Sequence, residues 1–178
     1  MDRLVVLADD HSEGATTAWD WICSQSWTGW RAKILTVVPE AVPAPGDSDP
    51  VEWQPPLPRV SPAAAALSSV RHFKAAGDPR NILSLLEADL LVIGPRGAGI
   101  AKKLHLGSVA EWLLDCPHAP TVIAREGGPV QRIVLAADGS PHAAAAAELL
   151  ASLPWAGSAH IDVVAVEVGD GQASAGAE

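Results

Sequence analysis

The glycines between positions 94 and 108 are spaced in a way that could bind a phosphate group. Two residues separate Gly94 from Gly97, nine separate Gly97 from Gly107, and Ser108 follows at once. Because glycine has no Cβ, the backbone N–H groups beside it can approach phosphate oxygens closely. Gly107 and Ser108 are predicted to begin a helix, whose N-terminus offers free N–H donors and a favourable dipole. The spacing therefore predicts a phosphate-binding loop.

Three cations lie in this loop of an otherwise acidic chain: Arg96, Lys102 and Lys103. Arg96 could hold a phosphate with two hydrogen bonds, while the lysines would act as mobile charges. The glycines match neither the GK[ST] of a Walker A loop nor the GxGxxG of a dinucleotide-binding fold. The alternative interpretation is a flexible glycine loop with solvated cations.

The elements that must position this loop alternate between strands and helices. Short apolar runs predict strands, and cap residues or prolines beside them predict helices. Residues 39–62 are rich in Pro, Asp and Gly, which is typical of a surface loop. Such alternation indicates a parallel sheet covered on both faces, whose ligands bind at the carboxyl ends of the strands. The expected strands are residues 4–8, 34–38, 70–75, 88–93 and 121–124, and the expected helices are 13–23, 63–67, 79–87 and 108–115.

In these motifs the chain resembles universal stress proteins. The family pattern, G-x2-G-x9-G-[S/T] after the fourth strand, is matched by the three glycines of the loop and by Ser108. Residues 4–12, 77–90 and 109–122 resemble the first strand and turn, the third crossover, and the last helix and strand of the family. The resemblance covers residues 1–125. It implies an α/β three-layer sandwich with a five-stranded parallel sheet, of the Rossmann-like adenine-nucleotide alpha hydrolase type.

The resemblance also implies an adenine nucleotide, which is ATP in many members with this glycine pattern, with Mg²⁺ held through its phosphates. Transferred position by position, Ala8, Asp10 and Val37 would face adenine and ribose, and Ile93 would line the base or sugar pocket. The residues expected around the ribose and the phosphates are Gly94, Arg96, Gly97, Gly107, Ser108 and Val109.

Three features depart from the family pattern. Pro95 stands where a small hydroxyl residue is usual, which removes one backbone donor from the loop. Asp9, Asp10 and His11 replace the usual Asp-Gly or Asp-Phe turn and add negative charge beside the pocket. The segment between the second and third strands is Pro-rich, where the family usually has a longer helix.

The turn after the first strand holds the residue types of a nucleophilic triad, Asp10, His11 and Ser12. Adjacent residues in one turn cannot converge as a triad must. We therefore predict that Ser12 caps the following helix and that Asp10 faces the ligand. The six histidines show no HExxH or similar spacing, so no metal is expected apart from Mg²⁺ on the nucleotide.

The chain then begins a second time. Residues 132–168 repeat residues 4–40 without a gap at a constant offset of 128 positions, so that Asp10 and Ser12 recur as Asp138 and Ser140. Duplication is favoured over chance similarity between two β–α–β units. Because the second copy ends before another glycine loop, one nucleotide site is expected per chain. We predict a universal-stress-type domain over residues 1–126, a linker over 127–131, a partial second repeat over 132–168 and a disordered tail over 169–178.

The composition limits the classes of binding partner that we expect for this chain. The chain has 178 residues, 48% of them hydrophobic, and a formal net charge of −9. Such an acidic chain is a poor electrostatic match for nucleic acid or anionic lipid, so neither is expected as a partner. No apolar run has the length of a membrane span, and Cys23 and Cys116 have no CxxC spacing, which is typical of reduced thiols. We expect a cytoplasmic homodimer with an unidentified protein partner.

No general base or activated nucleophile accompanies the loop. We therefore predict nucleotide binding in stress response or regulation, with little or no turnover. Two alternatives stay open. One is a nucleotide-free assembly module whose pocket is spoiled by Pro95 and Asp9. The other is a weak ATP-hydrolysing or adenylate-transferring enzyme, although neither an SGGxDS-type loop nor an HxGH-type turn is present.

Overall fold

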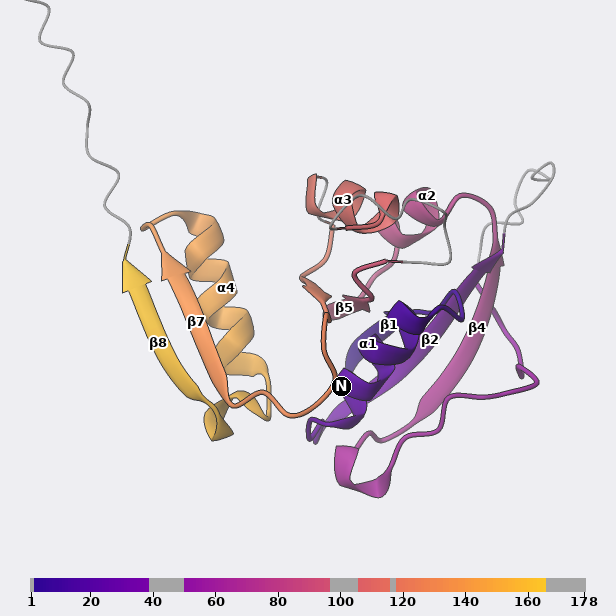
Figure 1. Cartoon of the computed structure of the whole chain (residues 1–178), viewed down its shortest axis with the longest axis horizontal. Coiled ribbons are helices and arrows are strands. Elements are labelled where there is room, and N and C mark those ends of the chain that lie inside the picture. The colour runs from indigo at the N-terminus through magenta and orange to yellow at the C-terminus, as the bar shows by residue number, and fades with distance from the viewer. Residues whose placement is uncertain (1, 39–49, 97–105, 116–117, 166–178) are drawn as a thin grey trace, which may run out of the picture. The chain divides into compact units, whose positions relative to one another are not determined.

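The computed structural model of the chain describes residues 2–38, 50–96, 106–115 and 118–165 (Figure 1). The chain forms two compact units, Met1–Pro129 and Val130–Glu178, which we call the first and the second unit. The boundary between them falls inside the predicted linker, and the predicted tail of residues 169–178 lies outside the described residues. None of the described helices is both long enough and apolar enough to cross a membrane.

The first unit is built on a six-stranded sheet with the strand order β3-β4-β2-β1-β5-β6. Five of the strands are parallel, as predicted, whereas β3 runs antiparallel to β4 at one edge. β3 has only two residues and lies inside the segment whose composition predicts a loop. The strands are β1 (Arg3–Ala8), β2 (Trp30–Val38), β3 (Val51–Glu52), β4 (Val70–Ala76), β5 (Leu90–Ile93) and β6 (Thr121–Ile123).

Helices cover both faces of this sheet, which confirms the three-layer prediction (Figure 1). α1 (Glu13–Cys23) covers one face, and α2 (Pro79–Ser84) and α3 (Ser108–Asp115) cover the other. A single 3-10 turn, η1 (Ala63–Ala65), replaces the short helix predicted for residues 63–67. α2 stops at Ser84, three residues before the predicted end of that helix.

The core of the first unit follows from the alternation of side chains along the strands. Val6 of β1 and Leu35 of β2 are fully buried beneath α2 and α3, where they pack with Leu83 and Leu113. The residues next to them in sequence point to the opposite face, toward α1. Both faces are therefore apolar, which explains the continuous hydrophobic runs of the parallel strands.

Over its described residues, 130–165, the second unit contains two parallel strands, one α-helix and a 3-10 turn. Its helix begins as α1 does: the hydroxyl of Ser140 accepts the Ala143 N–H at 3.1 Å, and the hydroxyl of Ser12 accepts the Ala15 N–H at 3.1 Å. The predicted cap at Ser12 is confirmed, and the second unit repeats it. The elements are β7 (Arg132–Ala137), α4 (Pro141–Ser152), η2 (Ala156–Ser158) and β8 (His160–Ala165).

The last strand of the second unit does not keep the constant offset of the sequence repeat. Val5 of β1 pairs with Ala32, whereas Ile133 of β7 pairs with Ile161. An offset of 128 positions would instead have paired Ile133 with His160. The turn η2 precedes β8, so the chain uses one more residue there than before β2. Relative to the offset of the predicted repeat, the pairing of β8 is therefore displaced by one residue.

Candidate functional site

The carboxyl ends of β1 and β5 lie side by side at the point where the strand order reverses. β1 pairs with β2 on one side and with β5 on the other. From β1 the chain crosses to β2, and from β5 it crosses to β6 in the opposite direction along the sheet. Ligands of open α/β sheets bind at such a switch point, outside the carboxyl ends of the strands. Ala8 and Ile93, two predicted site residues, end these two strands.

The glycine-rich segment leaves β5 and returns to α3 through a narrow neck. The Gly107 N–H donates to the carbonyl oxygen of Pro95 at 2.8 Å, and the Gly107 carbonyl accepts the Glu111 N–H at 2.9 Å. α3 then begins at Ser108, as predicted. Arg96 and Ser108 are both exposed at this neck. The neck uses the N–H of Gly107 for the fold itself, so this N–H is not among the donors that α3 could offer to a phosphate.

Four of the predicted site residues share one face of the sheet. Ala8, Val37, Ile93 and Val109 all belong to, or pack against, the hydrophobic cluster beneath α2 and α3. Ile93 is buried within that cluster, whereas the other three are partly buried. Gly94 follows Ile93 directly and is partly buried. The predicted residue Gly97 and the two loop lysines lie outside the described residues.

Asp10 does not join this group of residues. Its carboxylate is exposed, and its Oδ1 accepts the Ser12 N–H at 3.1 Å in the turn before α1. The second unit repeats this contact, since Oδ1 of Asp138 accepts the Ser140 N–H at 2.9 Å. Asp10 therefore shapes the turn before α1.

The carboxylate that is buried at the end of β1 belongs to Asp9, which is 3% exposed. Its two oxygens accept from Nε and Nη2 of Arg59 at 2.9 and 3.0 Å, and Oδ1 also accepts the His11 N–H at 3.0 Å. The sequence pattern indicates Asp9 as an extra negative charge beside the pocket, but the structure neutralises that charge internally. The sequence contains one indication of this ion pair, because Arg59 is the one basic residue among residues 39–62.

The environment of this pair favours the charged form of both partners. Burial raises the pKa of Asp9, but the hydrogen bonds from Arg59 and His11 and the charge of Arg59 outweigh it and hold the pKa below its ordinary value. The hydrogen bond to Asp9 raises the pKa of Arg59. The Arg59 guanidinium also donates to Oγ1 of Thr16 at 3.2 and 3.3 Å, so it connects the end of β1 to the first turn of α1.

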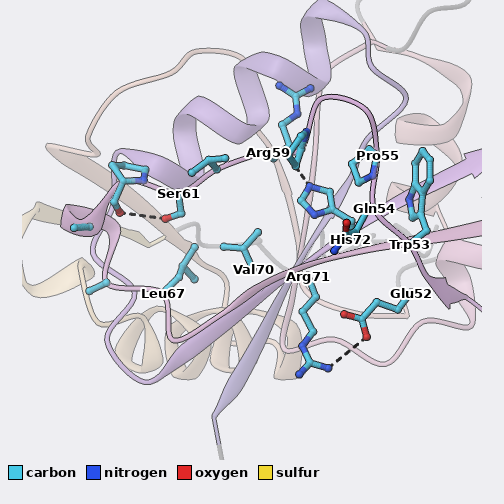
Figure 2. A pocket seen from close by; sticks show the side chains of 15 residues that line it. Glu52, Trp53, Gln54, Pro55, Arg59, Ser61, Leu67, Val70, Arg71 and His72 are labelled. Atoms are coloured by element: carbon cyan, nitrogen blue, oxygen red, sulfur yellow. Dashed lines mark hydrogen bonds and ion pairs between the residues drawn. The ribbon is translucent and has the colours of Figure 1, made fainter.

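A hollow of about 620 Å³ lies at the edge of the sheet and contains none of the predicted site residues (Figure 2). It is bounded by residues 52–67 on one side and by the start of β4 on the other. A second hollow, near Asp2 and residues 84–89, also contains none of them. Among the described residues, no group of three or more His, Cys, Asp or Glu side chains could hold a metal ion.

Comparison with known proteins connects this fold to solved structures. No protein-family model matches the chain, and no curated protein does. A universal stress protein from Archaeoglobus fulgidus DSM 4304 aligns with a TM-score of 0.64 and 20% identity, over 94% of this chain and 68% of that one. The hypothetical protein MJ0577 aligns with a TM-score of 0.50 and 15% identity, over 70% and 96% of the two chains. A universal stress protein in complex with cAMP aligns with a TM-score of 0.46 and 20% identity, over 69% and 96%.

Proposed function

We propose that this chain, which has the fold of universal stress proteins, binds an adenine nucleotide, ATP above all, at the carboxyl ends of β1 and β5. The observation that carries the proposal is the position of α3. The helix begins beside the switch point of the sheet, and its first turn is fixed by the bond between Gly107 and Pro95. A helix N-terminus at a switch point is a favourable place for phosphate.

The base and the ribose would lie against the apolar side of this edge. Ala8 and Val37, both partly buried, supply aliphatic surface there, which suits the faces of a purine ring, and Ile93 belongs to the buried cluster against which they pack. Asp10 lies just beyond β1, where its exposed carboxylate could accept a hydrogen bond from the nucleotide. These residues thus fit the base and the sugar by their chemistry.

The phosphates would lie against the polar side. Ser108 and Val109 contribute backbone N–H groups and the Ser108 hydroxyl, and Arg96 contributes a guanidinium. Gly97 would let the backbone approach the phosphates closely, whereas the space left by the missing Cβ of Gly94 is taken by the Gly14 backbone. Mg²⁺ would be held by the phosphate oxygens, with no dedicated protein cage.

The internal pairing of Asp9 supports nucleotide binding over a spoiled pocket. An unpaired carboxylate at the end of β1 would repel a phosphate, but Arg59 already compensates this charge at 2.9 Å. The remaining cation at the neck, Arg96, is exposed and available to an anion. We propose a regulatory role in stress response, in the cytoplasm, with little or no nucleotide turnover.

The second unit favours an assembly role beside nucleotide binding. It has the strand, the capped helix and the second strand of a first unit, and we propose that it is a partial second copy. Val134 and Val163 on its two strands are 61% and 65% exposed. Parallel strands are ordinarily covered on both faces, so we propose that these strands contribute to a homodimer or bind another protein.

Calorimetric titration of the full chain with MgATP, MgADP and MgAMP tests the nucleotide proposal. Binding is expected in the wild type, weaker binding in Arg96→Ala, and none in Gly107→Asp, because a carboxylate at the start of α3 repels phosphate. Gly157→Asp is the matched control, since that glycine lies in the second unit with open space around it. Absence of binding at millimolar nucleotide, with the circular dichroism of a folded protein, would refute the proposal and favour the assembly module.

A further inference from the structure

The segment of residues 53–62, which we call the strap, runs along the edge of the sheet with little support from it. Trp53 donates its N–H to the His72 carbonyl at 2.9 Å, which is the last contact of the β3 pairing. Beyond it the strap contains four prolines, which cannot donate to a strand ladder. The hollow of about 620 Å³ separates the strap from β4, and Leu57 and Val60 are 87% and 74% exposed. The strap therefore needs a specific attachment to stay in place.

Arg59 provides that attachment at both its backbone and its side chain. Its N–H donates to Nε2 of His72 on β4 at 2.9 Å, a contact that Figure 2 shows as a dashed line. Its guanidinium forms the two hydrogen bonds to Asp9 and also binds Thr16. One residue thus fastens the middle of the strap to β4, to the end of β1 and to α1.

The bond from Arg59 requires an unprotonated nitrogen on His72. Nε2 can accept the N–H only with its lone pair free, so the ring proton resides on Nδ1 and the imidazole is neutral. An imidazolium has protons on both nitrogens and cannot accept. Protonation of His72 and attachment of the strap backbone are therefore mutually exclusive.

The surroundings of His72 oppose its protonation. Burial lowers the pKa of His72, the Arg59 and His11 charges lower it further, and the Asp9 carboxylate acts in the opposite direction without prevailing. The other charged groups nearby are engaged elsewhere. Lys74, two residues along β4, places its ammonium over the Trp53 ring, and Glu52 pairs with Arg71 at 3.5 Å.

We propose that Arg59 and His72 form an acid-released latch that holds the strap against the edge of the sheet. When the strap is released, the His72 imidazole has its ordinary pKa of about 6.5, and in the latched form its pKa is lower. The latch is therefore fully stable above about pH 6.5 and weakens as the pH falls through the lower value. The pKa of Asp9 lies below its ordinary value, so the guanidinium end stays paired while the backbone end releases. Release frees the backbone of the strap from β4 beside the hollow, while the Arg59 side chain stays attached to Asp9.

Hydrogen exchange of the full chain without nucleotide tests the latch, and its outcome does not depend on the proposed function. The protection of the Arg59 N–H, corrected for the intrinsic exchange rate, should fall by up to about tenfold from about pH 7.5 to about pH 5.5, the most that a released imidazole with its ordinary pKa allows. The N–H groups of β1 serve as the internal reference and should keep their protection. Protection that does not change with pH, or that falls equally in β1, overturns the proposal.

Variants separate His72 from the other histidines. His72→Gln retains a possible acceptor without a titratable group, so the change of protection with pH should disappear. His72→Phe removes the acceptor, so protection should be low at both pH values. His118→Gln, an exposed histidine in the same unit, should behave as the wild type. A pH dependence that persists in folded His72→Gln contradicts the latch.

A measurement on the wild type covers the case in which the His72 variants do not fold. Nitrogen NMR of the imidazole should show Nε2 of His72 unprotonated at about pH 7.5. Its titration midpoint should coincide with the loss of protection at Arg59. A protonated Nε2 at that pH, or midpoints that differ by more than about one pH unit, overturns the proposal.

Discussion

Gly14, in the first turn of α1, and Gly94, directly after β5, lie in backbone contact. A Cβ placed on Gly94 would overlap the carbonyl group of Gly14, and one placed on Gly14 would overlap the carbonyl oxygen of Arg96. The Ser12 hydroxyl approaches the same Arg96 oxygen at 3.4 Å. The start of α1 and the exit from β5 therefore meet without side chains between them at the switch point of the sheet.

Gly14→Ala should destabilise the first unit, although helix propensity alone predicts the reverse. Alanine is favoured over glycine inside a helix by up to about 1 kcal/mol. Overpacking at the backbone of residues 94–96 should outweigh this and give a net loss of about 1–3 kcal/mol. Urea unfolding measures the change. Gly157→Ala, where a Cβ meets nothing, should lie within about 0.5 kcal/mol of the wild type. A stabilised Gly14→Ala variant would show that the two segments are not in contact.

His11→Gly should stabilise the first unit by up to about 1 kcal/mol, because His11 has a left-handed backbone with φ of 60° that disfavours side chains. The corresponding residue of the second unit is Gly139, with φ of 78°. The reciprocal variant Gly139→His should lose stability in the second unit. Thermal unfolding of both variants measures the changes, and a loss of stability in His11→Gly would contradict the expectation.

Asp9→Asn should destabilise the first unit by about 2–3 kcal/mol, because it leaves the Arg59 guanidinium without its counter-ion. The value lies below that of a fully buried pair because the Arg59 side chain is 18% exposed. Glu52→Gln is the control, since its pair with Arg71 is 3.5 Å long and exposed, and its change should lie within about 0.5 kcal/mol. Similar losses of unfolding free energy in Asp9→Asn and Glu52→Gln would contradict the expectation that burial makes the Asp9 pair the stronger one.

The pair of Asp9 and Arg59 also determines part of the dependence of the unfolding free energy on pH in the acid range. Since the pKa of folded Asp9 lies below its ordinary value, its contribution is fully present above about pH 4 and is lost as the pH falls through the lower value. Asp9→Asn should therefore flatten the dependence of the unfolding free energy on pH in that acid range. Urea titrations at a series of pH values measure the slope, and an unchanged slope would contradict the pairing.

The Cys23 thiol should react slowly with alkylating reagents. Burial and the Asp20 carboxylate raise its pKa to about 11, against the opposing charge of Arg59. The thiolate fraction at about pH 8 should then be about 100-fold below that of an ordinary thiol. Alkylation rates in a Cys116→Ala background test this, with the urea-unfolded chain as the control. Equal rates in the folded and unfolded chains would contradict the shifted pKa.

Features set by neighbouring residues could be predicted from the sequence. Ser12 and Ser140 cap their helices because a hydroxyl accepts the N–H three residues later, which depends only on local spacing. α3 occupies residues 108–115 as predicted. Its bounds could be predicted because Gly107 precedes it and Pro117 follows it in the sequence. The five parallel strands follow from continuous apolar runs, because strands buried on both faces need them. The one-residue displacement of β8 could not be predicted, since it arises in the turn η2.

The candidate site could be predicted less completely. The pair of Asp9 and Arg59 joins residues 50 positions apart, and no periodicity connects them. The composition of residues 39–62 predicts a surface loop and indicates neither the short strand β3 nor the attachment of the strap. Asp10 is predicted to face the ligand, yet the buried carboxylate is that of its neighbour Asp9, which pairs with Arg59. Tertiary contacts decide these points, and local rules do not describe them.

The hydrogen bond between Gly107 and Pro95 joins the two ends of the loop that we propose binds phosphate. At 2.8 Å it holds the exit from β5 against the start of α3, so we expect both elements to keep their places when the connection changes. Closing a loop costs only about 0.6 kcal/mol more for each doubling of its length. We therefore expect that the connection could be lengthened, shortened or recharged, to change the proposed preference for an anion, without rebuilding the domain.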